Sequence, residues 1–159
     1  MRGCFFAIGL LLWADAIEAS LDRPADQKPS EHRVQVSVVV ILGSEKDDKV
    51  DRKLTGIAQE VRKMHPRVKG FRMVNLSSRS LAIGTASEFD LVEKQKVSVT
   101  VEAAADSYDR VRLKVGPPLM GQITYSTPCG KFLPIVTPFR TASNDLLILA
   151  IRVQPCGKK

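Results

Sequence analysis

The chain has 159 residues, 44% of them hydrophobic and 26% charged, which leaves room for one soluble domain with a buried core. No repeat of roughly 20–50 residues is visible, which argues against a repeat architecture. The net charge of +7 would allow contact with anionic polymers, cell-wall material or a membrane surface. The same charge keeps a protein in solution, so it selects no partner by itself.

The N-terminus has the pattern of a secretory signal. Arg2 supplies a positive charge, Gly3–Ala14 is apolar, and small residues follow up to Ala16 and again at Ala19. The apolar run is too short to cross a bilayer, which takes about 20 residues. We therefore expect residues 1–19 to be removed as a signal peptide, with no transmembrane segment left. The protein is then exported, either to the periplasm or out of the cell.

Cleavage after Ala19 would change both the charge and the cysteine content. It removes Arg2, Asp15 and Glu18, so 24 basic and 17 acidic residues become 23 and 15, and the net charge becomes +8. It also removes Cys4. Two cysteines then remain, in a compartment where disulfides persist.

The polar stretch 20–33, SLDRPADQKPSEHR, carries two prolines and no apolar period. We expect a flexible spacer there, and one compact domain over 34–157. The domain opens with Val34–Leu42, which begins with alternation and becomes continuously apolar. This pattern predicts a strand that is covered on both faces.

Helical periodicity follows over 51–64. Its apolar face is made of Leu54, Ile57, Ala58 and Val61. Asp48 or Asp51 is expected to cap the N-terminus of this helix. His65 precedes a proline and is expected to end it, because proline pushes the residue before it out of the α conformation.

The rest of the chain shows β-type signals. The candidate strands are Phe71–Leu76, Ser80–Ile83, Phe89–Val92, Lys96–Ala103, Val111–Val115, Gln122–Thr127 and Leu146–Val153. Two prolines, Pro134 and Pro138, confine Phe132–Phe139 to an edge strand or a loop.

Two of these segments alternate strictly and predict an antiparallel hairpin of Lys96–Ala103 with Tyr108–Val115. The expected register sets Glu102 opposite Arg110, Thr100 opposite Arg112, and Ser98 opposite Lys114. That register turns the valines and Leu113 toward the core.

The two cysteines of the mature chain stand in the same local sequence. Cys129 and Cys156 each follow a proline and precede a glycine, at the exits of Gln122–Thr127 and Leu146–Val153. We expect the two exits to meet and the cysteines to form a disulfide. The rival interpretation, a reactive or intermolecular thiol, lacks the C-x-x-C spacing.

The order of the elements, β-α-β and then several short strands, predicts an α+β domain that is mostly β. One amphipathic helix packs on a largely antiparallel sheet or sandwich. The pieces VDRKLTGIAQEVRKM, GFRM, KFLPIV and VQPCG resemble a family of small exported bacterial proteins with no established activity. The resemblance spans most of the mature chain and implies export, but it transfers no site residue.

Candidate catalytic and metal-binding residues are few. Four acids in the loop 45–51 offer oxygen ligands for Ca²⁺, but without EF-hand spacing, so capping and solvation explain them more simply. The histidines, His32 and His65, show no metal-ligand spacing and no nucleophile motif, and His65 is expected at the surface. No cofactor or metal is expected, and no pair of carboxylates stands out for hydrolysis.

Basic residues gather on the polar positions of the predicted hairpin. Lys96, Arg110, Arg112 and Lys114 form a candidate polyanion-binding face, or else simply the solvated face of a sheet. Aromatic side chains are sparse there, and an exported protein seldom meets nucleic acid, so a nucleic-acid partner is not expected.

The sequence therefore favours an exported, non-enzymatic binding or scaffold domain of the cell envelope. Two alternatives stay open. A hydrolase would have a carboxylate site that the sequence does not identify. A polyanion-binding module would bind an anionic envelope polymer through the basic face.

Overall fold

The computed structural model describes residues 33–155. The predicted signal peptide, nearly all of the predicted spacer, and Cys156 lie outside these residues. The elements are β1 (Arg33–Ser44), the 3-10 helix η1 (Arg52–Leu54), α1 (Thr55–Met64), β2 (Gly70–Ala82), β3 (Ala86–Asp90), β4 (Lys96–Ala103), β5 (Arg110–Gly116), β6 (Ile123–Pro128), β7 (Phe132–Arg140) and β8 (Leu146–Pro155).

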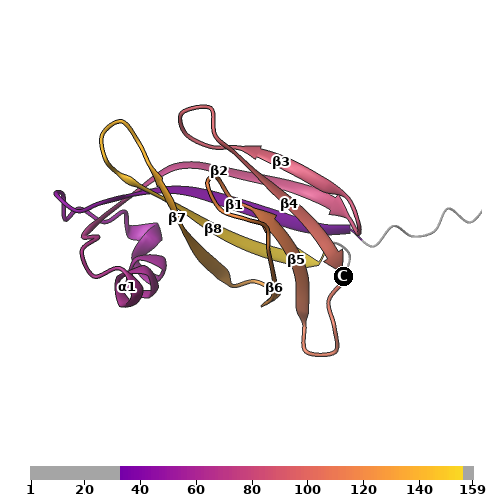
Figure 1. Ribbon diagram of the computed structural model, residues 1–159. Helices are drawn as coiled ribbons and strands as arrows, with labels where there is room; N and C mark the ends of the chain where they lie inside the picture. Colours follow the sequence, from indigo (N-terminus) through magenta and orange to yellow (C-terminus); the bar gives the residue numbers. More distant parts are fainter. Residues whose placement is uncertain (1–32, 156–159) are drawn as a thin grey trace, which may run out of the picture. The chain divides into compact units, whose positions relative to one another are not determined.

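The strands form two four-stranded antiparallel sheets (Figure 1). Sheet A has the order β2-β1-β8-β7, and sheet B has the order β3-β4-β5-β6. The predicted α+β, mostly β class is therefore confirmed, as is the edge position of β7, which contains Pro134 and Pro138.

The prediction of two separate strands over 71–76 and 80–83 is wrong. One strand, β2, runs through both segments. The polar residues between them, Ser77 to Arg79, stay in the strand because β2 lies at the edge of sheet A, where their side chains are exposed or half-buried.

β4 and β5 form the predicted antiparallel hairpin, but the predicted register is wrong by two residues. Thr100 lies opposite Lys114 rather than Arg112. A shift of two residues keeps each side chain on its own face of the sheet, because the side-chain period is two. Val101 and Leu113 are consequently buried, as predicted.

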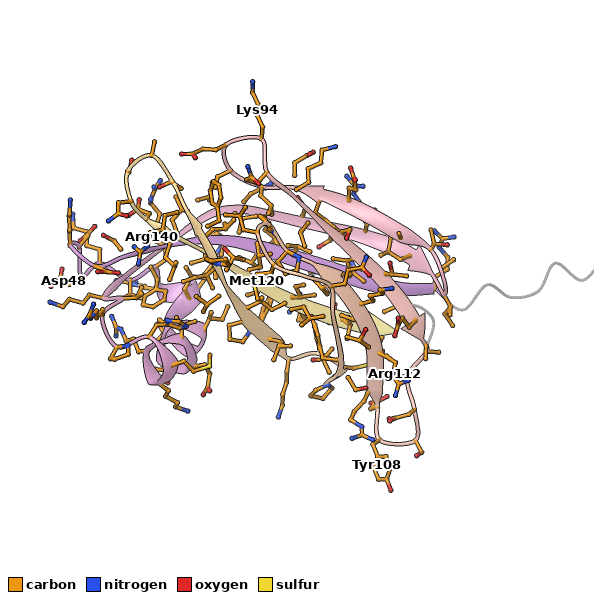
Figure 2. All side chains as sticks on the ribbon, viewed as in Figure 1. Asp48, Lys94, Tyr108, Arg112, Met120 and Arg140 are labelled. Atoms are coloured by element: carbon orange, nitrogen blue, oxygen red, sulfur yellow. The ribbon has the colours of Figure 1, made fainter. Side chains whose placement is uncertain are left out.

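Two local features cause the shift. The ladder is irregular between Val101 and Ala103, so Glu102 has no partner on β5. In the loop, the Asp106 carboxylate accepts the backbone N–H groups of Tyr108 and Arg110, each at 2.9 Å. The predicted Glu102–Arg110 pair is replaced by an Asp106–Arg110 ion pair of 3.0 Å. Figure 2 shows Tyr108 at the tip of this loop.

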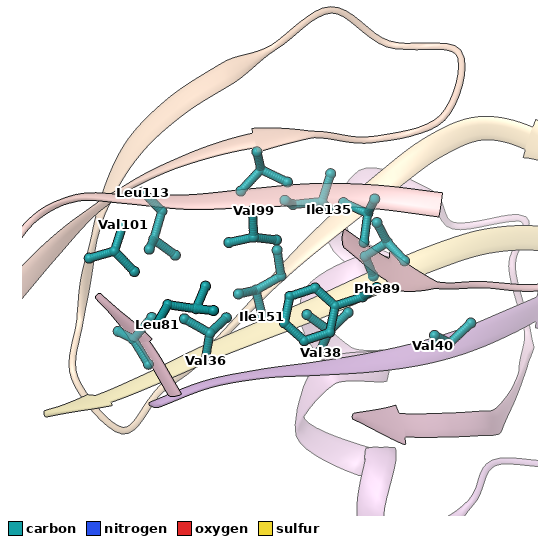
Figure 3. Close-up of a cluster of buried hydrophobic side chains, with 14 of the residues drawn as sticks. Val36, Val38, Val40, Leu81, Phe89, Val99, Val101, Leu113, Ile135 and Ile151 are labelled. Atoms are coloured by element: carbon teal, nitrogen blue, oxygen red, sulfur yellow. The ribbon is translucent and has the colours of Figure 1, made fainter. Parts of the chain in front are cut away.

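The main core lies between the two sheets (Figure 3). Alternate residues of both sheets point into it, and β1 and β8 supply nine of them: Val34, Val36, Val38, Val40, Leu42, Leu147, Leu149, Ile151 and Val153. Sheet B contributes chiefly the valines of β4 and β5, together with Leu113 and Phe89.

A second core lies on the other face of sheet A, under α1. The predicted apolar face of the helix, with Ile57, Ala58 and Val61, packs on Val39 and Ile41 of β1. β1 is therefore covered on both sides, as its continuous apolar run predicts. α1 ends at Met64, and His65 has φ −130° and ψ 72°, outside the α region, as expected of the residue before a proline.

Candidate functional site

The four residues of the predicted basic face all belong to the outer face of sheet B, opposite the core. Lys96 binds Glu88 of β3 at 2.8 Å, and Arg110 binds Asp106 at 3.0 Å. The hydrogen bond from Lys96 holds the pKa of Glu88 below its ordinary value and raises the pKa of Lys96. Two of the four cations are thus already paired with acids.

The other two basic residues lie side by side along β5 among hydroxyl groups. Lys114 stands between Thr100 and Thr124 on the neighbouring strands, and Arg112 stands opposite Ser126. No ion pair to Arg112 or Lys114 occurs within residues 33–155. Only this part of the predicted face would meet an anion without first losing an internal partner.

Cys129 is half-buried just after β6, and its predicted partner Cys156 lies outside the described residues. The backbone N–H of the next residue, Gly130, donates to the carbonyl of Val153 at 2.8 Å. The exit of β6 therefore lies beside the end of β8, which is the arrangement that the predicted disulfide requires.

Three of the four acids in the loop between β1 and η1, namely Glu45, Asp47 and Asp51, bind other groups of the fold. Asp51 stands at the N-cap position of η1, one of the two positions predicted, but its side chain makes no capping hydrogen bond. Its Oδ2 accepts the backbone N–H of Met73 at 2.7 Å instead. Asp47 Oδ1 accepts the N–H of Lys49 at 3.1 Å, and Glu45 pairs with Arg140 at 2.8 Å.

A hollow of about 410 Å³ lies beside this loop. Asp47, Asp51 and Asp145 line it together with Arg72 and Lys49. Asp145 is 4.0 Å from Arg72. Within residues 33–155 no group of three acidic, histidine or cysteine side chains is placed to hold a metal.

His65 is exposed, as predicted, and His32 lies outside the described part of the chain. The buried polar side chains of residues 33–155 are Ser37, Thr127 and Thr137, so no carboxylate in this range is buried. An acid–base site of the kind anticipated for a hydrolase would therefore have to use exposed or half-buried carboxylates.

A surface trough of about 550 Å³ runs along the outer edge of β2. Asp51, Arg52, Lys53, Met73, Val74, Asn75 and Leu76 line it, and we call it the β2 trough. Val74 and Leu76 are 44% and 53% exposed. Two cations and two apolar side chains are thus presented together beside the edge of a sheet.

A bulge in β2 brings these side chains to the trough. β1 is regular along this pairing, whereas β2 has one extra residue, Val74, between Met73 and Asn75. Because of the extra residue, Leu76 lies opposite Val39 and projects from the same face of sheet A as Met73. Strict alternation would have placed Leu76 on the opposite face.

The β2 edge differs from the other three sheet edges of the described chain. β7 contains Pro134 and Pro138, β6 ends at Pro128, and β3 has five residues. β2 has 13 residues and no proline. Short strands, prolines and bulges discourage the addition of a further strand. β2 is long and free of proline, and its bulge at Val74 lies before Leu76 and Ser78.

The backbone groups that β2 turns away from β1 follow from the register. The N–H groups of Phe71 and Met73 bond to Lys49 and Asp51, so both residues direct their backbone outward. They stand opposite Gly43 and Ile41 of β1. In an antiparallel pair, every second residue directs its N–H and C=O groups away from the partner strand. The residues opposite Val39 and Ser37, two and four positions before Ile41 in β1, therefore also direct their backbone outward. These residues are Leu76 and Ser78.

Sequence reasoning missed the β2 trough because it divided β2 into two short strands. The signal that was present is a proline-free run, GFRMVNLSSRSLA, with four consecutive polar residues at 77–80. Such a run is typical of an edge strand.

No family model, curated protein or solved structure matches the chain. Within the described residues, no helix is long and apolar enough to cross a membrane.

Proposed function

We propose that this protein is an exported, non-enzymatic binding domain that takes up an extended polypeptide segment as an added strand on β2. The observation that carries the proposal is the long, proline-free edge of β2 beside the β2 trough. In strand addition, main-chain hydrogen bonds supply affinity, and the neighbouring side chains supply selectivity. Leu76 and Ser78 offer the main-chain hydrogen-bonding groups, and the side chains of the β2 trough offer the selectivity.

Export is the part of this proposal that rests on the sequence. The charged, apolar and small-residue order of the first 19 residues supports a periplasmic or extracellular location. The resemblance to small exported bacterial proteins supports the same location. The partner would then be a protein of the cell envelope.

The two alternatives have weaker support. A polyanion-binding module would use the outer face of sheet B, where Lys96 and Arg110 are already paired with acids. A hydrolase would use the carboxylates around the hollow, but Asp47 and Asp51 each bind a backbone N–H there. Neither site combines apolar surface with open backbone groups, as the β2 trough does.

The test is a selection of random heptapeptides displayed on phage, with the protein as purified from the expressing cell as bait. Selected peptides are synthesised and their dissociation constants measured by fluorescence anisotropy. Amide exchange is followed with and without peptide. Binding should slow exchange at the N–H groups of Leu76 and Ser78. Ser77 and Arg79, which face β1, should change little.

A matched pair of variants locates the site. Leu76→Glu should weaken peptide binding at least tenfold, because it places a charge where an apolar side chain of the peptide would pack. Leu119→Glu, at a leucine that is 74% exposed in the β5–β6 loop, should bind as the wild type does. Equal binding by both variants, or selected peptides that leave the Leu76 and Ser78 amides unprotected, would overturn the proposal.

The polyanion alternative is tested on the same proteins with polyphosphate as the probe. The alternative predicts that polyphosphate binding weakens steeply with salt. It also predicts that binding is lost in Arg112→Ser/Lys114→Ser and kept in Arg52→Ser/Lys53→Ser. The two double variants remove the same charge from different faces.

A further inference from the structure

We infer that the segment received by the β2 trough is the free C-terminal end of a partner chain, running antiparallel to β2. The inference rests on the proposed function and adds the direction and the chemistry of the bound segment. It depends on two features of the trough: one end is closed by the protein's own chain, and the cations lie at that end.

The closed end is formed by the loop before η1. Val50 makes a parallel bridge to Phe71 of β2. The N–H of Phe71 donates to the carbonyl of Lys49 at 2.8 Å, and the N–H of Asp51 donates to the carbonyl of Phe71 at 3.0 Å. The Asp51 carboxylate then accepts the N–H of Met73 at 2.7 Å. The edge of β2 is therefore occupied as far as Met73.

The other limit of the site lies near Ser80. The guanidinium of Arg33 donates to the Ser80 carbonyl at 2.9 Å. The outward backbone groups of Leu76 and Ser78 lie between the two limits. A strand added there is short, and it cannot continue past Val74 along the same edge without displacing the loop 49–51.

Charge selects the direction of the added strand. Arg52 and Lys53 are exposed, line the trough beside its closed end, and make no ion pair within residues 33–155. The carboxylate of Asp51 lies at the same end but accepts the N–H of Met73, so two cations and one anion leave this end with a net positive charge. An antiparallel segment ends near Val74 and brings its terminal carboxylate to these cations. A parallel segment would bring its N-terminal end to the same place, where an ammonium group would be repelled.

The same charge argues against a second copy of this chain as the occupant. Pairing of two β2 edges about a two-fold axis would bring Arg52 and Lys53 of each copy to the other copy's β2, whose exposed charged side chains are Arg72 and Arg79. A segment with a terminal carboxylate matches the charge of Arg52 and Lys53. One or two apolar side chains on the same segment would pack against Val74 and Leu76.

The experiment uses one selected heptapeptide in three forms: with a free carboxylate, with a C-terminal amide, and with a Gly-Ser-Gly extension after its last residue. The amide should bind about fivefold more weakly, as expected for the loss of a partly exposed charge interaction. The extension should bind more weakly still, because the added residues meet the loop 49–51. Three forms that bind within twofold of one another would overturn the inference.

The double variant Arg52→Ser/Lys53→Ser should bind the carboxylate and amide forms with equal affinity, because it removes the cations that distinguish the two forms. Arg112→Ser/Lys114→Ser, its control on sheet B, should keep the difference between them. If all three forms bind within twofold of one another and still protect the Leu76 and Ser78 amides, the C-terminal inference fails and strand addition stands. If no form protects them, strand addition itself fails.

Discussion

At the scale of single residues, two glycines show how differently the same substitution should act. A Cβ on Gly70 would lie 2.5 Å from the Asp47 carbonyl oxygen and 3.2 Å from that of Lys49, whereas nothing lies within 4 Å of a Cβ on Gly56. Gly70→Ala should therefore lower the free energy of unfolding by about 1–3 kcal/mol. Gly56→Ala, in α1, should raise it by about 0.5–1 kcal/mol. Urea denaturation measures both, and two changes of the same sign would contradict this account.

A second residue-scale prediction concerns acid. The pKa of Asp106 lies below its ordinary value. The largest cause is the hydrogen bond from the backbone N–H of Arg110, followed by those from the Arg110 side chain and the backbone N–H of Tyr108. A carboxyl whose folded pKa is lowered stabilises the fold above its unfolded pKa of about 3.9, and this contribution is lost as the pH falls through the folded pKa. Asp106→Asn should therefore lower the melting temperature at pH 7.

The difference between Asp106→Asn and the wild type should shrink below about pH 4 and vanish in stronger acid, where the wild-type carboxyl is protonated as well. Melting curves recorded from pH 7 to pH 2.5 provide the measurement. A constant difference across this range would mean that the asparagine disturbs the loop by its shape rather than by its missing charge.

At the scale of elements, periodicity located β1, α1, β4, β5 and β8 because each has one or two buried faces. Periodicity did not predict the strand register where a single side chain or an extra residue determines the pairing. The hairpin register depends on Asp106 and on the irregularity at Glu102, neither of which has a periodic signature. The β2 trough depends in the same way on the bulge at Val74.

The predicted disulfide is an element-scale prediction, since it would tie the exits of β6 and β8. The loop closed between Cys129 and Cys156 counts 28 residues with both cysteines included. Non-reducing mass analysis of the purified protein should show no free thiol at either position. Cys129→Ser should cost about 3.6 kcal/mol on the chain-entropy estimate, and Cys129→Ser/Cys156→Ser should cost no more. Two free thiols, with a melting temperature unchanged by reductant, would refute the bond.

At the scale of the whole molecule, the described domain is held together by the first strand and the last. β1 and β8 pair over ten positions at the centre of sheet A and supply half of the core between the sheets. Deletion of the chain from Leu146 onward should therefore abolish cooperative unfolding. A truncated chain that still melted in one sharp calorimetric transition would contradict this view of the core.

Because β1 pairs with β8, sheet A cannot be completed until the end of the chain has been synthesised. About 100 residues separate the end of β1 from the start of β8. At a synthesis rate of about 5–20 residues per second, β1 emerges roughly 5–20 seconds before its partner. A hairpin with β2 forms in about 1–10 μs, but it pairs only one edge of β1 and leaves the backbone N–H and C=O groups of the other edge without their strand partner. Until β8 arrives, the growing chain is a substrate for aggregation. Its yield in the cell should depend on chaperones that hold nascent chains more than its final stability would suggest.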